Sequence, residues 1–208
     1  MSNYLELTQL PDGTIVLRRS DDPDNPIEGQ IWYDETAATL QYQIPNVTSS
    51  GSFRTGNAMN TARRQGAGAG IQTSALAFGG ETPGAFGVAN NESYDGISWT
   101  EVADLNTARY SLGLGGGASS TDAIAVGGEL PSISGIVETW NGSSWTETTD
   151  LNTARAGSGT SGSSTAAIAA SGLTSGSSVT ANSEQWNGSS WTETNNLSTS
   201  RYGNATTG

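Results

Sequence analysis

Apolar and polar positions alternate in short runs through the C-terminal three-quarters of the chain. The clearest unit extends from about Arg109 to Asn152 and contains four such runs, each bounded by glycine or other turn-forming residues. These runs span residues 110–116, 122–128, 135–140 and 143–148. Period-two alternation over such lengths predicts β-strands, and no segment keeps a helical period of apolar residues. The pattern therefore predicts an all-β fold built from units of four short strands.

An Asn-Gly pair separates the last two runs of the unit, at Asn141-Gly142. The neighbouring units carry Asp95-Gly96 and Asn187-Gly188 at the same place. An Asn-Gly or Asp-Gly pair between alternating runs predicts a two-residue type I′ hairpin, in which both central residues have positive φ. We therefore expect three equivalent hairpins.

The units repeat with a period of 46 residues. Three sets of residues keep this spacing: Trp99, Trp145 and Trp191; Arg63, Arg109, Arg155 and Arg201; and Glu92, Glu138 and Glu184. Phe53 lies one period before Trp99, so a degenerate copy of the repeat can begin upstream of residue 56. A fixed period of this size is typical of repeat architectures.

Four antiparallel strands per repeat predict a propeller blade. One blade cannot bury both faces of its sheet, so blades stack face to face around an axis. On this hypothesis the tryptophans fill the space between blades. Double glycines close an apolar run at Gly79-Gly80 and Gly127-Gly128, and we expect the missing Cβ to admit an aromatic ring against the backbone. The third copy reads Ser171-Gly172.

An apolar strand ending in a glycine pair, then "VETWNGSSW", then a link such as "TDLNTAR", resembles the kelch repeat over about residues 56–208. The resemblance implies kelch-like β-propeller blades, four-stranded antiparallel sheets of about 46 residues each. The chain departs from the family in having Asn or Ser at the usual proline of the link. It holds only about three and a quarter repeats, so the ring is incomplete. We expect continuation past Gly208 to about five to seven blades, the alternative being several chains that complete one another.

Residues 1–47 lie outside the repeat and form a second predicted domain, before the repeats at 48–208. They contain strand-like runs at Thr14–Arg18, Gln30–Asp34 and Thr39–Ile44. The phrase "EGQIWYDETAATLQY" is similar to a short hairpin of tailed-phage structural proteins. That similarity implies an N-terminal β-hairpin segment that docks to a virion. The candidate docking residues are Ile31, Trp32, Tyr33, Leu40 and Tyr42.

Composition narrows the possible chemistry. The chain has 208 residues, a net charge of −12, and no Cys, His or Lys. An acidic chain without a basic surface is unsuited to nucleic acid. Absence of Cys and His excludes most zinc and transition-metal sites, so no cofactor or metal is expected. No run is long enough for a membrane span, and the first residues lack the features of a secretory signal.

The repeated arginines have two interpretations, a cluster that binds an anionic ligand or a scaffold element. One arginine at a fixed place in every repeat favours the scaffold, with the repeated glutamates as partners. Kelch propellers include galactose oxidase, whose chemistry needs histidine and cysteine that this chain lacks. The acidic loop at Asp21, Asp22 and Asp24 is best explained as solvated. No catalytic residue is assigned, and we expect no enzyme activity.

Two functional classes remain. The first is a non-enzymatic bacteriophage virion structural protein of tail, fibre, neck or decoration type, with the N-terminal segment docked and the propeller displayed. Its partners would be other virion proteins, further copies of itself, and a host surface glycan or protein. The alternative is a bacterial extracellular or cell-surface module that binds carbohydrate or protein. The N-terminal phrase favours the first class.

Overall fold

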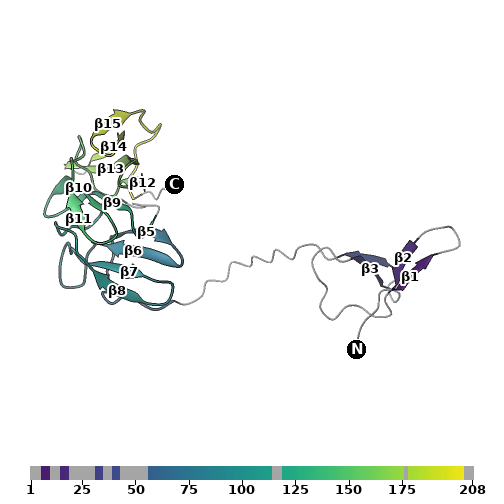
Figure 1. Cartoon of the computed structure of the whole chain (residues 1–208). Coiled ribbons are helices and arrows are strands. Elements are labelled where there is room, and N and C mark those ends of the chain that lie inside the picture. Colours follow the sequence, from purple (N-terminus) through teal and green to yellow (C-terminus); the bar gives the residue numbers. More distant parts are fainter. Residues whose placement is uncertain are drawn as a thin grey trace. The chain divides into compact units, whose positions relative to one another are not determined.

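The chain divides into two units, Met1–Arg54 and Thr55–Gly208. The computed structural model describes residues 56–113, 119–175 and 178–203 in full, and four strands of the first unit by their backbone alone (Figure 1). The domain boundary expected at residues 47 and 48, and Phe53, lie outside the described residues.

The first unit contains one four-stranded sheet in the order β1-β2-β3-β4. Its strands are β1 Glu6–Gln9, β2 Ile15–Arg18, β3 Ile31–Asp34 and β4 Thr39–Tyr42. Three of them match the expected runs, and β1 is additional. Strands β3 and β4 pair antiparallel from Ile31 opposite Tyr42 to Asp34 opposite Thr39. The phrase similar to the phage hairpin therefore folds as a hairpin, which joins β2 through a parallel pairing of Arg18 with Tyr33.

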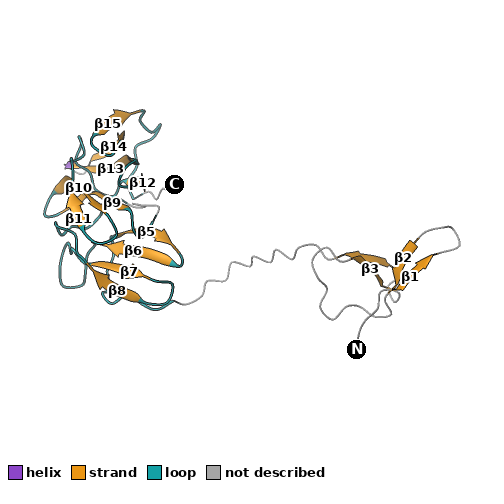
Figure 2. Cartoon of the chain, in the orientation of Figure 1, coloured by secondary structure: helices purple, strands orange, loops and turns teal. Residues whose placement is uncertain are grey.

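The second unit contains three antiparallel sheets, one per repeat (Figure 2). Sheet I comprises β5 Ala67–Ile71, β6 Ser74–Phe78, β7 Asn91–Tyr94 and β8 Trp99–Val102. Sheet II comprises β9 Ala123–Glu129, β10 Ile133–Trp140 and β11 Trp145–Glu147. Sheet III comprises β12 Gly159–Gly162, β13 Ala167–Thr174, β14 Ser178–Trp186 and β15 Trp191–Thr194. The fold is all-β, with no α-helix in the parts of the chain described.

The first strand expected in the second repeat, residues 110–116, is only partly described. Residues 114–118 lie outside the described residues, and Tyr110 forms an isolated bridge with Glu129. The equivalent strands β5 and β12 begin several residues after their arginines, Arg63 and Arg155. Residues 111–113 are not in a strand, so the described part of this expected strand contains only the bridge at Tyr110.

The three sheets stack face to face, as Figure 1 shows, and each interface holds one apolar cluster. Between sheets I and II, Leu76 and Phe78 pack with Trp140 and Trp145. Between sheets II and III, an aliphatic face of sheet II packs with Trp186 and Trp191. Since a single sheet leaves one face open to water, each repeat depends on its neighbour for burial.

Each repeated tryptophan is the first residue of an outer strand and lies beside a second aromatic residue. Ring centroids lie 5.4 Å apart in Trp140–Trp145 and in Trp186–Trp191, and 5.0 Å apart in Tyr94–Trp99. Trp145 and Trp191 are buried, but Trp99 is only half-buried. The expectation that all three repeated tryptophans fill the space between sheets therefore does not hold for Trp99. Trp145 packs 4.8 Å from the ring of Phe78 in sheet I, whereas no described sheet of the second unit precedes sheet I.

The three hairpin turns differ from the expected type I′. Positive φ occurs at Gly142 (95°) and not at Asn141. The side-chain oxygen of Asn141 accepts hydrogen bonds from the backbone N–H groups of Ser143 and Ser144, both at 3.0 Å. The turn is therefore centred one residue later, and asparagine contributes its side chain rather than a left-handed backbone. Asp95 and Asn187 make the same two bonds.

The glycine pairs serve a different contact from the one expected. Gly127 has a φ of 60°, and a Cβ there would overlap the backbone carbonyl of Arg155. At Gly79, with a φ of 62°, a Cβ would overlap the side chain of Leu112. The groups that approach are thus the next linker and an aliphatic side chain, and no aromatic ring is involved. Left-handed backbone and close approach both favour glycine.

A chain of backbone hydrogen bonds connects the repeats at one column of equivalent positions. Ser111 N–H donates to the carbonyl of Gln65 at 2.9 Å, Gly157 to Ser111 at 2.7 Å, and Gly203 to Gly157 at 2.8 Å. All four residues have positive φ, including the non-glycine residues Gln65 and Ser111. The same backbone geometry therefore recurs four times at the 46-residue period.

Candidate functional site

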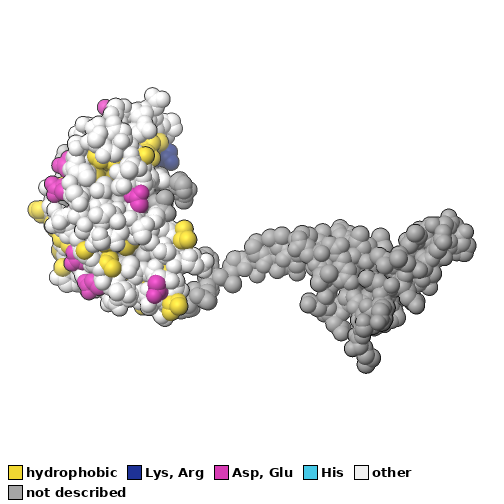
Figure 3. Space-filling view, viewed as in Figure 1, with side chains coloured by type: hydrophobic (Ala, Val, Ile, Leu, Met, Phe, Trp, Pro, Cys, Tyr) yellow, Lys and Arg dark blue, Asp and Glu magenta, His cyan; other side chains and the backbone are white. Residues whose placement is uncertain are grey.

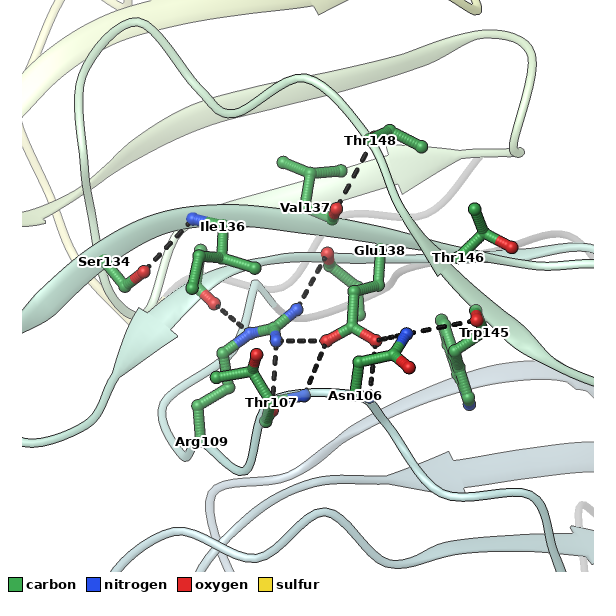
Figure 4. Close-up of polar contacts among 12 residues, drawn as sticks. Asn106, Thr107, Arg109, Ser134, Ile136, Val137, Glu138, Trp145, Thr146 and Thr148 are labelled. Carbon is green, nitrogen blue, oxygen red and sulfur yellow. Dashed lines mark hydrogen bonds and ion pairs between the residues drawn. The ribbon is translucent and has the colours of Figure 1, made fainter.

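Each linker between sheets binds a buried glutamate of the sheet that follows it. Figure 4 shows this junction between sheets I and II, where Glu138 on β10 faces the linker residues Asn106, Thr107 and Arg109. The backbone N–H groups of Asn106 and Thr107 donate to the carboxylate at 2.7 Å and 3.2 Å. The Arg109 guanidinium donates to the same carboxylate at 2.5 Å. Arg109 also donates to the carbonyl of Gly127 at 2.9 Å.

The junction recurs at the other two described sheets with the same partners. Glu92 accepts from the backbone of Asn60 and Thr61 and pairs with Arg63. Glu184 accepts from the backbone of Asn152 and Thr153 and pairs with Arg155. The linker asparagine also donates its side-chain amide to the backbone carbonyl of the following repeated tryptophan. Each repeated arginine of the first three linkers is thus used within the scaffold.

Burial determines what these groups can do. The side chains of all three pairs are at most 3% exposed. A buried ion pair is stable only when further hydrogen bonds replace the lost hydration, and each carboxylate here accepts at least three. For Glu92, burial acts to raise the pKa, but the backbone N–H groups of Asn60 and Thr61 and the charge of Arg63 outweigh it and hold the pKa below its ordinary value. The guanidinium groups of the three arginines therefore bind within the junctions between sheets, and Arg63 also borders the pocket of the first repeat.

Arg201 is the fourth member of the series and differs from the other three. It is exposed, and its guanidinium Nε donates to the backbone carbonyl of Thr199 at 3.4 Å. The structure therefore brings together Arg63 with Glu92, Arg109 with Glu138 and Arg155 with Glu184, and leaves Arg201 at the surface.

The candidate docking residues of the first unit fall on strands β3 and β4. Ile31, Trp32 and Tyr33 lie on β3, and Leu40 and Tyr42 lie on β4. Their backbones pair in one hairpin, in the register Ile31–Tyr42 and Tyr33–Leu40. Their side chains lie outside the described part of the structure.

A second column of equivalent residues varies from repeat to repeat. The residue after each of the first three repeated arginines forms an isolated backbone bridge with the residue after the glycine pair, or after Ser171-Gly172 in the third repeat: Arg64 with Glu81, Tyr110 with Glu129, and Ala156 with Leu173. Arg64 makes a bidentate ion pair with Glu81, at 3.0 Å and 2.9 Å, which raises the pKa of its guanidinium. For Tyr110, burial raises the phenol pKa, and the charge of Glu129 adds to this effect. The column therefore changes from charged to apolar along the stack.

In the first repeat, the bridging pair Arg64 and Glu81 borders a pocket of about 590 Å³. The segment between β6 and β7, residues 79–90, is longer than its counterparts 130–132 and 175–177. It contributes Glu81 and Phe86 to the lining of the pocket, and the linker contributes Arg63 and Arg64. Phe86 is 76% exposed. Sequence reasoning missed this site, although the extra length of one loop in a regular repeat was a usable signal.

Acidic side chains are spread over the described residues. No three acidic side chains gather closely enough among them to hold a metal ion. On the face shown in Figure 3, acidic side chains are scattered and basic ones are rare. Among the residues that the structure describes, no helix could cross a membrane.

Comparison with known proteins gives the fold but no family. Neither a scan against protein-family models nor a search of curated proteins finds a match. Among solved structures, the chain is similar to YjhT, with a TM-score of 0.56 and 13% sequence identity. The similarity covers 78% of this chain and 51% of the YjhT chain, so this chain spans about half the length of that protein. At such identity the likeness shows an all-β fold of antiparallel sheets and carries nothing about activity.

Proposed function

We propose that the chain is a non-enzymatic structural protein of a bacteriophage virion, anchored through its first unit. The observation that supports this most is the β3–β4 hairpin, formed by the phrase similar to a hairpin of tailed-phage structural proteins. The hairpin belongs to a sheet in its own unit, separate from the repeats. A docking segment joined to a repeated module suits attachment on one side and display on the other.

The three stacked sheets are, in this proposal, blades of a kelch-like β-propeller. Three features support it: the 46-residue period, the linkers that lead from the outer strand of one sheet to the next sheet, and the recurring hydrogen-bonded column at Gln65, Ser111 and Gly157. A column of equivalent backbone positions suits sheets arranged around an axis.

The non-enzymatic part of the proposal rests on how the charged residues are used. Arg63, Arg109 and Arg155 are buried in ion pairs with glutamates. The chain has no His or Cys to serve as base or nucleophile. In this proposal the protein is located in the virion. Its expected partners are neighbouring virion proteins, further copies of the chain, and a host surface glycan or protein.

Deletion of residues 1–47 in the phage genome tests the anchoring role. We expect particles that lack the protein, while the truncated protein, residues 48–208, accumulates in the lysate with its repeats folded. The matched point variant is Trp32→Ala with Tyr33→Ala, and the matched control is Ile97→Ala, an exposed residue of the repeats. Mass spectrometry of purified particles measures incorporation. Full incorporation of the truncated protein into particles would show that the repeats, and not residues 1–47, bind the particle.

A second candidate is an extracellular module that binds carbohydrate or protein, and the pocket beside Phe86 favours it. An exposed aromatic ring next to an arginine–glutamate pair offers stacking and hydrogen bonding within a volume suited to a small ligand. A glycan array probed with the purified chain tests this function. Binding that Phe86→Ala abolishes and Ile97→Ala retains would support it, and the particle assay above reports on the virion role independently.

A further inference from the structure

The linker after sheet III, residues 198–201, is hydrogen-bonded to sheet III in the same way as the earlier linkers are bonded to the sheets they follow. Gly172 N–H donates to the carbonyl of Arg201 at 2.9 Å, as Gly128 does to Arg155 and Gly80 does to Arg109, both also at 2.9 Å. Leu197 N–H donates to Ala181 at 2.9 Å, equivalent to the bond from Leu151 to Gly135. The column of positive φ continues into Gly203. The backbone is therefore set to carry a junction of the same kind.

What differs is the side of this linker that faces away from sheet III. Ser198, Thr199 and Arg201 stand one period after Asn152, Thr153 and Arg155, which together hold Glu184. The side chain of Arg155 is fully buried, whereas Arg201 is exposed. A cation and two backbone donors are thus placed in a geometry that binds a carboxylate elsewhere in the molecule.

The apolar face beside this linker is uncovered in the same way. Ile168 on β13 is 40% exposed, whereas its equivalents Leu76 and Ile124 are buried at 2% and 0%. Leu197 is half-buried, whereas its equivalents Leu105 and Leu151 are buried. Each equivalent is covered by the sheet that follows it.

We propose that this surface, formed by linker 198–201 with Ile168 and Leu197, is a docking site for a further sheet of the same repeat type. The sheet would carry a glutamate on its third strand, which Arg201 and the backbone of residues 198 and 199 bind. Charge complementarity identifies the occupant, because three described junctions pair this linker pattern with such a glutamate. A second copy in the described conformation does not fit, since its own linkers already hold Glu92, Glu138 and Glu184. The inference stands whether or not the chain is a virion protein.

The test supplies such a sheet in register. In an extended chain, a copy of residues 158–203 replaces residues 204–208, so that the copied Glu184 lies one period after the original. Arg201→Gln is then made in the 208-residue chain and in the extended chain. We expect the unfolding midpoint to change by less than about 2 °C in the first and to fall by about 6 °C or more in the second. Changing the copied glutamate to glutamine is expected to reproduce the larger loss.

Three results would overturn the proposal. The first is an equal effect of Arg201→Gln in both chains. The second is an added copy that stays open to limited proteolysis while residues 56–203 are protected, since the surface would then not accept a sheet. The third is a dimer of the 208-residue chain, seen by sedimentation and abolished by Arg201→Gln, because the occupant would then be a second copy.

Discussion

The two interfaces between sheets use different apolar side chains around the same polar junction. Between sheets I and II, the ring of Phe78 packs against Trp145 at 4.8 Å. Between sheets II and III, the equivalent of Phe78 is Val126, which lies in one cluster with Trp191. The glutamate, the arginine and the linker asparagine are unchanged at both interfaces.

The difference indicates a division of roles. Apolar contacts depend on total volume and tolerate a change from aromatic to aliphatic when the neighbours adjust. A buried carboxylate that accepts from two backbone N–H groups and a guanidinium has only one satisfactory position. We infer that the glutamate junction sets the register between sheets, and that the apolar residues supply most of the burial.

Removing a junction glutamate is expected to have the largest effect. Glu138→Ala leaves the Arg109 guanidinium buried without its carboxylate, and should lower the free energy of unfolding by about 3–5 kcal/mol. Arg201→Ala, at an exposed member of the same series, should change it by less than about 0.5 kcal/mol. Urea unfolding followed by tryptophan fluorescence measures both. Similar losses in the two variants would contradict the distinction between buried and open junctions.

Replacing an interface tryptophan by alanine should lower the free energy of unfolding almost as much as Glu138→Ala does. Trp145→Ala and Trp191→Ala each create a large cavity, and we expect about 3–5 kcal/mol for each. Trp99→Ala should cost clearly less, because Trp99 is half-buried. The same unfolding assay compares the three variants. A loss at Trp99 equal to that at Trp145 would show that its face is covered in solution.

Adding a methyl group at the glycine pair should lower the free energy of unfolding by less than the glutamate or tryptophan substitutions do. Gly127→Ala places a Cβ against the carbonyl of Arg155 in a left-handed backbone, with an expected loss of about 1–3 kcal/mol. Gly84→Ala is the control, since nothing lies within 4 Å of its Cβ position. If Gly127→Ala is as stable as Gly84→Ala, the linker does not approach as closely as described.

The pH dependence should be the most modest effect. The pKa of Glu92 is lower in the fold than its ordinary value near 4.5, so its contribution to stability is complete above that value and is lost as pH falls through the folded-state pKa. Unfolding free energy should therefore fall as the pH drops below about 4.5. In Glu92→Gln the slope should be shallower, and the gap from the parent chain should shrink as pH falls. Parallel pH profiles would show that Glu92 does not contribute in this way.

Much of the fold could be predicted because its signals are periodic. Alternation and the 46-residue spacing predicted the strands, and the shared spacing predicted arginine and glutamate as partners. The turn type was missed because an asparagine before glycine can supply either its backbone or its side chain. Trp99 was misjudged because its burial depends on a neighbouring sheet. The Phe86 pocket was missed because a single long loop has no period.

A double-mutant cycle on Arg109 and Glu138 tests the central claim most directly. The variants are Arg109→Gln, Glu138→Gln and the double variant, each measured by urea unfolding at neutral pH. The claim predicts that either single change costs about as much as both together, because each leaves the other group buried without its partner. Additive losses would mean that the two residues act independently, and would contradict the inference that the arginine–glutamate junction sets the register of the stack.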